Sequence, residues 1–196
     1  SFKGQFSDFT KEYFELLDYD ENSRILELGG GTGVIGRNFI EYRNFKGKYV
    51  VSDLSKELLN FGEKKAKELE LDNHLEFKQI DAMSEIILDQ GSCDAIIMHT
   101  LVSHVPNPAV VIENAKKLLK RNGKIIIFDA DYETLLMASG NKELDEIVNA
   151  AIKKGCVAQP KVMRLIPKIA NSLKLKLIKY KSNLLFEAGS AEFFYG

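Results

Sequence analysis

The sequence predicts an α/β fold, a Rossmann-like three-layer sandwich in which helices cover both faces of a mostly parallel β-sheet. Three observations support this prediction. Short apolar runs alternate with amphipathic helical patterns, several of the runs are rich in Ile and Val with little polar alternation, and the first run leads into a glycine-rich turn. Alternating strands and helices build a parallel sheet, and strands buried on both faces lack a polar face.

Six strands are predicted from the apolar runs, in chain order. They cover residues 24–28, 48–52, 75–79, 95–99, 124–129 and 174–186. The last run differs from the others because its lysines partly alternate with apolar residues. This alternation predicts a strand that has one solvated face.

Helices are predicted between the strands from apolar residues at helical spacing. They cover approximately residues 33–42, 55–69 and 108–121, and a further helix follows Pro160. Ser55 is expected to cap the start of its helix. The pair Asn122-Gly123 is expected to end the helix before it, because these residues accept the left-handed conformation of a helix stop.

The chain is expected to form one domain over residues 1–196, with residues 1–22 as a helical cap. The cap is predicted from aromatic and apolar side chains at helical spacing, namely Phe6, Phe9, Tyr13, Phe14 and Leu17. We favour packing of this helix on the core over a role as a lid. Only residues 188–196 follow the sixth predicted strand, which are few for a turn and a seventh strand, so we also consider that the chain is cut from a longer protein.

The composition argues against several classes of protein. Apolar residues make up 45% of the chain, charged residues 28%, and the formal net charge is -1, as in an ordinary globular protein. There is no excess of positive charge for a nucleic acid and no apolar run that could span a bilayer. Cys93 and Cys156 are too far apart for a metal-binding pair and form no disulfide framework. We therefore expect a cytoplasmic protein with a small-molecule partner, and leave its oligomeric state open.

The glycine-rich turn allows two interpretations. Gly31 to Gly36 fits G-x-G-x-x-G, and Asp53 follows Gly33 by about 20 residues, as in the dinucleotide fingerprint. Alternatively, Glu27 to Gly33 forms one unit, an acid followed by G-x-G-x-G. In both cases the glycines let the backbone approach a ligand closely, and the next helix presents free N–H groups.

Glu27 favours the second interpretation. A carboxylate would repel an anionic pyrophosphate, whereas it would attract the sulfonium and ammonium groups of S-adenosylmethionine. The carboxylate of that cofactor can still bind at the helix N-terminus. The alternative for Glu27 is a buried acid held by backbone N–H groups.

Together with this turn, four later segments resemble the class I methyltransferases, and in particular the ubiquinone/menaquinone-biosynthesis branch, over about residues 7–187. These segments are Val50–Ser55, Gln79–Met83, Cys93–His99 and Asn122–Lys124, in which Asn122 stands where the family usually has Pro. The resemblance implies the sheet order 3-2-1-4-5-7-6 and S-adenosylmethionine as cofactor. It assigns cofactor binding to Glu27, Gly29, Gly31, Gly33, Asp53, Leu54, Asp81, Ala82, Met83 and His99.

The resemblance also implies individual roles. Asp53 would hold both ribose hydroxyls, Asp81 would meet the adenine amino group beside Ala82 and Met83, and His99 would touch the methionine end. The acids make chemical sense without the family, because carboxylates accept such hydrogen bonds and open α/β sheets bind ligands at the carboxyl ends of their strands. The alternative for each Asp is a cap or turn residue.

Methyl transfer by in-line displacement requires mainly orientation of the acceptor and exclusion of water. A base is needed only if the acceptor arrives protonated. His104 and Tyr132 are the candidate catalytic residues, although a structural role that fixes the loop is favoured for His104. Asp131 is expected to line the acceptor pocket beside Tyr132, and Asp129 to be a structural acceptor.

Two alternative functions remain open at this point. An NAD-dependent oxidoreductase would use the Gly31–Gly36 pattern and Asp53, but it gives no role to Glu27 or Asp81. A non-catalytic cofactor-binding module would explain why no convincing base is present. No cluster of His, Cys and Asp has the spacing of metal ligands, so no metal is expected.

Overall fold

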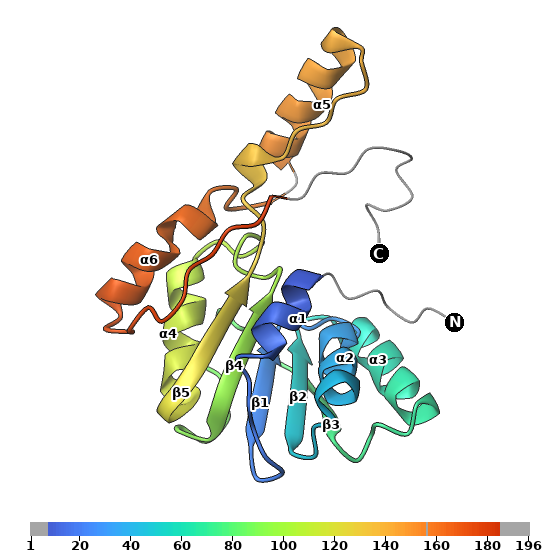
Figure 1. The fold of residues 1–196 in the computed structure, drawn as a ribbon, viewed down its shortest axis with the longest axis vertical. Helices are drawn as coiled ribbons and strands as arrows, with labels where there is room; N and C mark the ends of the chain where they lie inside the picture. The colour runs from blue at the N-terminus through green and yellow to red at the C-terminus, as the bar shows by residue number, and fades with distance from the viewer. Residues whose placement is uncertain (1–7, 156, 185–196) are drawn as a thin grey trace.

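A computed structural model of the chain describes residues 8–155 and 157–184. Five strands of this part form one parallel sheet in the order β3-β2-β1-β4-β5 (Figure 1). The strands are β1 Arg24–Leu28, β2 Lys48–Asp53, β3 Leu75–Gln79, β4 Cys93–His99 and β5 Leu119–Phe128. The predicted α/β class and the order of the first five strands are therefore confirmed.

Helices cover both faces of the sheet, as Figure 1 shows. The helices of the described part are α1 Asp8–Phe14, α2 Val34–Arg43, α3 Lys56–Glu68, α4 Pro108–Leu118, the 3-10 turn η1 Tyr132–Thr134, α5 Lys142–Gly155 and α6 Val162–Ser172. Side chains of α1, α2 and α3 share one core cluster with the sheet, and side chains of α4 and α6 share the other. The two clusters give the three predicted layers.

The alternation of side chains along β1 decides which face each candidate residue serves. Ile25 packs in the cluster beneath α1, α2 and α3, whereas Leu26 and Leu28 pack in the cluster beneath α4 and α6. Glu27 therefore points to the same face as Ile25, because successive side chains of a strand alternate. The carboxyl group enters a layer made mainly of apolar and aromatic side chains.

The predicted N-terminal helix is present as α1, and it packs against the core as favoured. Tyr13, Phe14 and Leu17 are buried. Phe6 and the side chain of Phe9 lie outside the described part of the chain. Ser55 caps α3 as predicted, since its side chain accepts a hydrogen bond from the Leu58 N–H.

The predicted boundary between α4 and β5 is wrong. The helix ends at Leu118 rather than Arg121. Asn122 does adopt a left-handed conformation, with φ of 69°, but it lies inside β5, where the register to β4 shifts between Cys93 and Ala95. The left-handed residue thus belongs to an irregularity in the ladder rather than to a helix stop.

The sixth predicted strand is not formed over residues 174–184, and the last two residues of its predicted range lie outside the described part of the chain. Side chains hold this segment instead: Lys179 and Lys181 both donate to Glu12 at 2.7 Å, and the Tyr180 hydroxyl donates to the Met163 carbonyl. Within the described residues, β5 is an edge strand, and the two final strands of the order 3-2-1-4-5-7-6 are not seen. The predicted single solvated face is also not found, because Leu177 and Ile178 are exposed along with the lysines.

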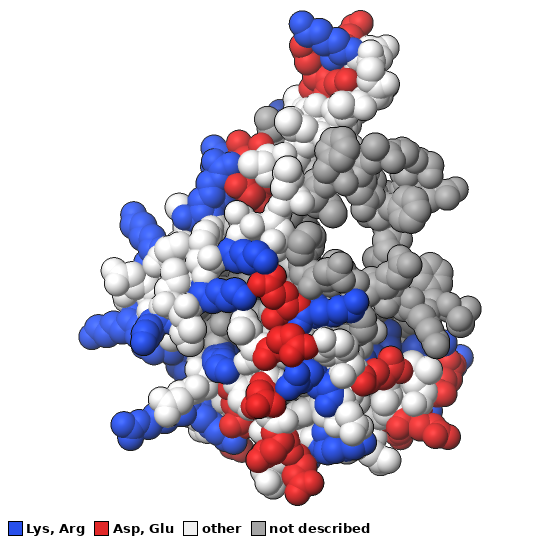
Figure 2. Space-filling model, viewed as in Figure 1, with Lys and Arg blue, Asp and Glu red and all other residues white. Residues whose placement is uncertain are grey.

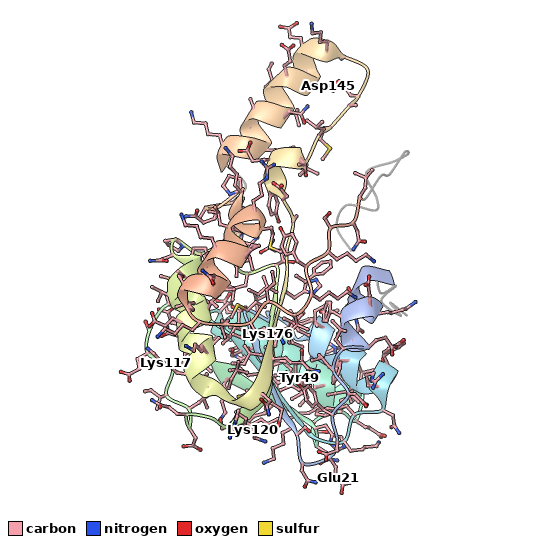
Figure 3. All side chains as sticks on the ribbon, turned by 60° about the vertical axis from the view of Figure 1, so that its left-hand side comes forward. Glu21, Tyr49, Lys117, Lys120, Asp145 and Lys176 are labelled. Carbon is pink, nitrogen blue, oxygen red and sulfur yellow. The ribbon has the colours of Figure 1, made fainter. Side chains whose placement is uncertain are left out.

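Helix α5 was not predicted, and it projects away from the sheet (Figure 1). Asn149 exchanges two hydrogen bonds with the Met137 backbone, and Asp145 accepts from the N–H and hydroxyl of Ser139. Figure 3 shows Asp145 on this projecting helix. The exposed apolar side chains Leu144 and Ile147 leave α5 with a partly uncovered apolar face.

Charges of both signs are mixed over the face shown in Figure 2, in keeping with the near-neutral net charge. Among the described residues, none of the helices has the length and apolar character needed to cross a membrane.

Candidate functional site

The loops that follow the five strands meet at one edge, because the strands are parallel. The glycine turn after β1 is fixed by hydrogen bonds from the Gly30 N–H to the Ser52 carbonyl and from the Gly33 N–H to the Gly30 carbonyl, both at 2.8 Å. Gly29, Gly31 and Gly33 all have positive φ. Gly33 precedes α2 with φ of 73°, and a Cβ atom there would lie 2.9 Å from the Phe77 ring. The turn thus requires glycine and leaves the start of α2 at the sheet edge.

Asp53 connects the glycine turn to the loop after β2. One carboxylate oxygen accepts from the Gly31 N–H at 2.8 Å, and the other accepts from the Ser55 N–H at 2.9 Å. These contacts bring Asp53 and the glycine turn together. They also show that Asp53 stabilises the turn before α3, which was the alternative interpretation of this residue. Leu54, which follows it, is 66% exposed.

Asp81 lies in the loop after β3. It accepts from the Met83 N–H and from the Ser84 hydroxyl, at 2.9 and 2.8 Å. These hydrogen bonds lower the pKa of the Asp81 carboxyl, so the side chain is ionised at neutral pH. Ala82 and Met83 are partly buried against the core.

The loops that carry Asp53 and Asp81 are neighbours. The Ile80 N–H donates to the Asp53 carbonyl at 3.0 Å. Because this bond continues the pairing of β2 with β3, both acids lie at adjacent positions along the sheet edge. The structure thus brings together the glycine turn and the two acids that the sequence separates.

Glu27 is buried directly beneath the glycine turn and is only 1% exposed. The Tyr49 hydroxyl donates to its carboxyl at 3.0 Å, and Figure 3 shows Tyr49 within the layered core. A Cβ atom at Gly30 would lie 2.8 Å from the Glu27 carboxyl carbon. Burial raises the pKa of Glu27 to about 8, against the opposing effects of the Tyr49 hydrogen bond and the positive charge of Arg37.

His99 ends β4 beside the glycine turn, because its neighbour Met98 pairs in register with Leu28. The imidazole stacks on Phe128, with ring centroids 4.6 Å apart and planes at 19°. Its Nδ1 atom lies 2.8 Å from the Tyr13 hydroxyl of α1. Burial lowers the pKa of His99 to about 4, so the imidazole is neutral at pH 7.

The two candidate catalytic residues are brought together from different loops. The His104 and Tyr132 rings meet edge to face, with centroids 6.3 Å apart. His104 is exposed, and its backbone N–H donates to the Leu101 carbonyl at 2.9 Å. These contacts place both rings on the loops after β4 and β5.

The two acids after β5 have structural partners. Asp129 accepts from the N–H and the hydroxyl of Ser103, both at 2.9 Å, which confirms the predicted acceptor role. Asp131 accepts from Arg164 of α6 at 2.6 Å and from the Glu133 N–H. Asp131 is therefore held by α6, and its place in the acceptor pocket stays a prediction.

Sequence reasoning missed the two tyrosines that contact the candidate residues. Tyr13 was recognised only as part of an apolar helix face, and Tyr49 only as part of a strand. A cavity of about 450 Å³ lies elsewhere, between residues 85–90 and α4, and none of the candidate residues lines it. Among the residues that the structure describes, no group of three or more His, Cys, Asp or Glu side chains could hold a metal ion.

Comparisons with known proteins point to one family. The family model described as "Methyltransferase domain" matches residues 19–184. The ubiquinone/menaquinone biosynthesis C-methyltransferase UbiE of Sinorhizobium fredii is 29% identical over 109 residues, which cover 56% of this chain and 42% of that protein. The chain thus spans about two fifths of the length of this curated relative.

Solved structures share the fold. Phosphoethanolamine N-methyltransferase 2 of Haemonchus contortus, in complex with S-adenosyl-L-methionine, superposes with a TM-score of 0.66 at 17% identity, covering 88% of this chain and 39% of that one. A geranyl diphosphate methyltransferase in complex with GPP and sinefungin gives a TM-score of 0.65 at 14% identity, covering 84% of this chain and 58% of that one. At these identities the likeness concerns the fold alone.

Proposed function

Because this chain belongs to the methyltransferase domain family, we propose that it binds S-adenosylmethionine and transfers the methyl group to a small molecule. The sulfonium of this cofactor, when bound, supplies a methyl group that is already activated for displacement. The chain has to bind the cofactor, hold the acceptor in line and exclude water. The observation that carries the proposal is the hydrogen bond from the Gly31 N–H to Asp53. It connects the glycine turn after β1 with the acid that ends β2, at the same edge of the sheet.

The carboxylates of Asp53 and Asp81 can each accept further hydrogen bonds, as binding of a nucleoside requires. A carboxylate offers about four lone-pair directions, and Asp53 uses one on each oxygen for Gly31 and Ser55. Capacity remains for ribose hydroxyls. Asp81 likewise keeps acceptor capacity for the adenine amino group while its loop bonds hold it in place.

The remaining cofactor contacts are assigned by position along the same edge. Leu54, Ala82 and Met83 would border the nucleoside, and His99 would face the methionine end beside Gly29. The start of α2 would receive the cofactor carboxylate, because free N–H groups and the helix dipole favour an anion there. Gly29, Gly31 and Gly33 would let the backbone approach the ligand.

Glu27 gives weaker support for a cationic cofactor than the sequence analysis expected from a charged carboxylate. With its pKa raised to about 8, the carboxyl is largely protonated at pH 7. A neutral acid does not repel a pyrophosphate, so the charge argument against a dinucleotide is weaker than the sequence suggests. The family match, in contrast, favours methyl transfer and gives no support to an NAD-dependent oxidoreductase.

For the acceptor we propose a position near His104 and Tyr132, which lie on the loops after β4 and β5 and whose rings meet edge to face. Either residue could orient the acceptor, and a base is required only for a protonated nucleophile. A small molecule and a cytoplasmic location remain our proposals, as does the assignment of all contacts above.

Isothermal titration with S-adenosylhomocysteine and with NAD tests the cofactor. We expect adenosylhomocysteine to bind and NAD not to bind, and the reverse result would overturn the proposal. A screen of small acceptors with radiolabelled S-adenosylmethionine then tests catalysis. Cofactor binding without turnover on any acceptor would favour the non-catalytic module instead.

A further inference from the structure

Tyr13 of α1 packs against His99 and Phe128, which end the strands β4 and β5. The residue is 7% exposed, and its ring packs at 5.0 Å from Phe14 and 5.8 Å from Phe128, measured between ring centroids. Tyr13 precedes residues 19–184, which match the family model. Tyr13 therefore lies outside the segment that the family model matches, whereas His99 lies inside it.

The hydroxyl of Tyr13 and Nδ1 of His99, 2.8 Å apart, form a hydrogen bond whose direction can be argued. Both groups are neutral at pH 7, because burial lowers the pKa of His99 and raises that of Tyr13. A neutral imidazole carries one donor and one acceptor nitrogen. Among the described residues, His99 Nδ1 is the hydrogen-bond partner of the Tyr13 hydroxyl, so a hydroxyl that did not donate to it would keep its proton without an acceptor. Since an unsatisfied buried donor is costly, the hydroxyl donates to Nδ1.

A donating hydroxyl determines where the imidazole proton resides. If Nδ1 accepts, the single ring proton must be on Nε2. Stacking on Phe128 restricts the rotation of the ring, so the Nε2–H has a defined direction. His99 lies next to the glycine turn through the pairing of β1 with β4, and this donor lies on the opposite side of the ring from Nδ1.

We propose that Tyr13 is a positioning residue that fixes His99 in the Nε2–H tautomer, so that His99 donates a hydrogen bond to the amino-acid end of the bound cofactor. This inference rests on the proposed function and deepens it. Tyr13 does not itself touch the ligand. It selects which nitrogen of His99 carries the proton.

The first test is spectroscopic and needs no ligand. ¹⁵N NMR of the imidazole nitrogens should show His99 as the Nε2–H tautomer in the wild-type protein and a mixture of tautomers in Tyr13→Phe. Tyr19→Phe is the matched control, since the Tyr19 hydroxyl donates instead to the Asp94 carbonyl at 3.0 Å, and it should leave the His99 signals unchanged. An Nδ1–H tautomer in the wild type would overturn the inference without any variant.

The second test compares two ligands by isothermal titration. Adenosylhomocysteine carries the amino-acid end, and methylthioadenosine lacks it. Tyr13→Phe should weaken adenosylhomocysteine binding by about three- to tenfold, the effect of one poorly oriented hydrogen bond, and leave methylthioadenosine unchanged. Tyr19→Phe should change neither affinity.

The outcomes separate the two proposals. An equal loss for both ligands, or no loss for either, would overturn the positioning role of Tyr13 while leaving cofactor binding intact. Failure of the wild-type protein to bind either ligand would overturn the proposed function, and with it the cofactor part of this inference. The NMR signals would still decide the tautomer.

Discussion

At the scale of single residues, Glu27 presents the sharpest conflict between charge and burial. Its carboxyl is enclosed beneath Gly30 with the Tyr49 hydroxyl as partner, and burial raises the pKa from 4.5 to about 8. A group that binds its proton more tightly in the folded state contributes stability below its unfolded pKa and loses that contribution as the pH rises. Between pH 4.5 and about 8, Glu27 therefore ionises in the unfolded chain but stays protonated in the folded protein. The free energy of unfolding falls as the pH rises through this window.

We predict that Glu27→Gln removes much of this pH dependence. The wild-type free energy of unfolding should fall as pH rises from 5 to 9, by up to about 1.4 kcal/mol per pH unit within the window, while the variant stays flatter. Urea denaturation at several pH values measures both. Equal pH dependence in the two proteins would show that Glu27 keeps an ordinary pKa.

Cofactor binding should change the protonation of Glu27. A bound sulfonium and ammonium would lower its pKa, so binding of S-adenosylmethionine at pH 7 should release a proton from the wild type. Glu27→Gln should release none and bind the cofactor more weakly by about 1–2 kcal/mol. Titrations in buffers of different ionisation enthalpy measure the proton release. Tighter NAD binding in the variant above pH 8, where the wild-type Glu27 is ionised, would instead favour the dinucleotide interpretation.

Asp53 serves both the loop and, in our proposal, the ribose. Asp53→Ala should lower the affinity for adenosylhomocysteine and for methylthioadenosine alike, each by at least about tenfold, because both ligands contain the ribose. It should also cost about 1 kcal/mol of stability, since the Gly31 and Ser55 N–H groups lose their acceptor. Isothermal titration and urea denaturation give the two values. A loss of stability with unchanged affinity would make Asp53 a turn residue only.

At the scale of elements, sequence patterns predicted the strand limits and helix caps that depend on neighbouring residues in the chain. β1 and β3 begin and end where their apolar runs do, and Ser55 caps α3 through its own loop. The end of α4 was misplaced because a left-handed Asn122 is compatible with both a helix stop and a bulge, and only the pairing of β5 with β4 decides between them. The segment at residues 174–184 was predicted as a strand for a similar reason. Alternating lysines and apolar residues do not specify which strand the segment would pair with.

Gly33 allows a test of the turn that starts α2. Gly33→Ala should destabilise the protein through left-handed strain, about 1–2 kcal/mol, and additionally through contact with the Phe77 ring, 2.9 Å from the new Cβ. Gly140→Ala is the matched control, because Gly140 also has a positive φ but nothing lies within 4 Å of its Cβ position. Chemical denaturation should rank Gly33→Ala as the more damaging variant. Equal losses would mean that the Phe77 ring moves aside freely.

At the scale of the whole molecule, the sequence located the candidate site because parallel strands bring their loops to one edge. Glu27 is the last residue but one of β1, Asp53 ends β2 and Asp81 follows β3. Their separation along the chain does not matter once the sheet order is known. The contacts that tune the site were not predictable. Tyr13 meets His99 across 86 positions, and nothing in the local pattern of either residue specifies that pair.

This arrangement predicts where a ligand should slow hydrogen exchange. If the cofactor binds along the sheet edge, adenosylhomocysteine should protect backbone amides in residues 29–33, 53–55 and 81–83, since a ligand stabilises the segments that close around it. Helix α5 projects from the sheet, and the cavity beside residues 85–90 contains none of the candidate residues, so neither should gain protection. Hydrogen exchange with mass spectrometry, with NAD as the comparison ligand, measures each segment. Protection centred on α5 or on residues 85–90 would move the binding site away from the glycine turn, and the proposed roles of Asp53 and Asp81 would fall together.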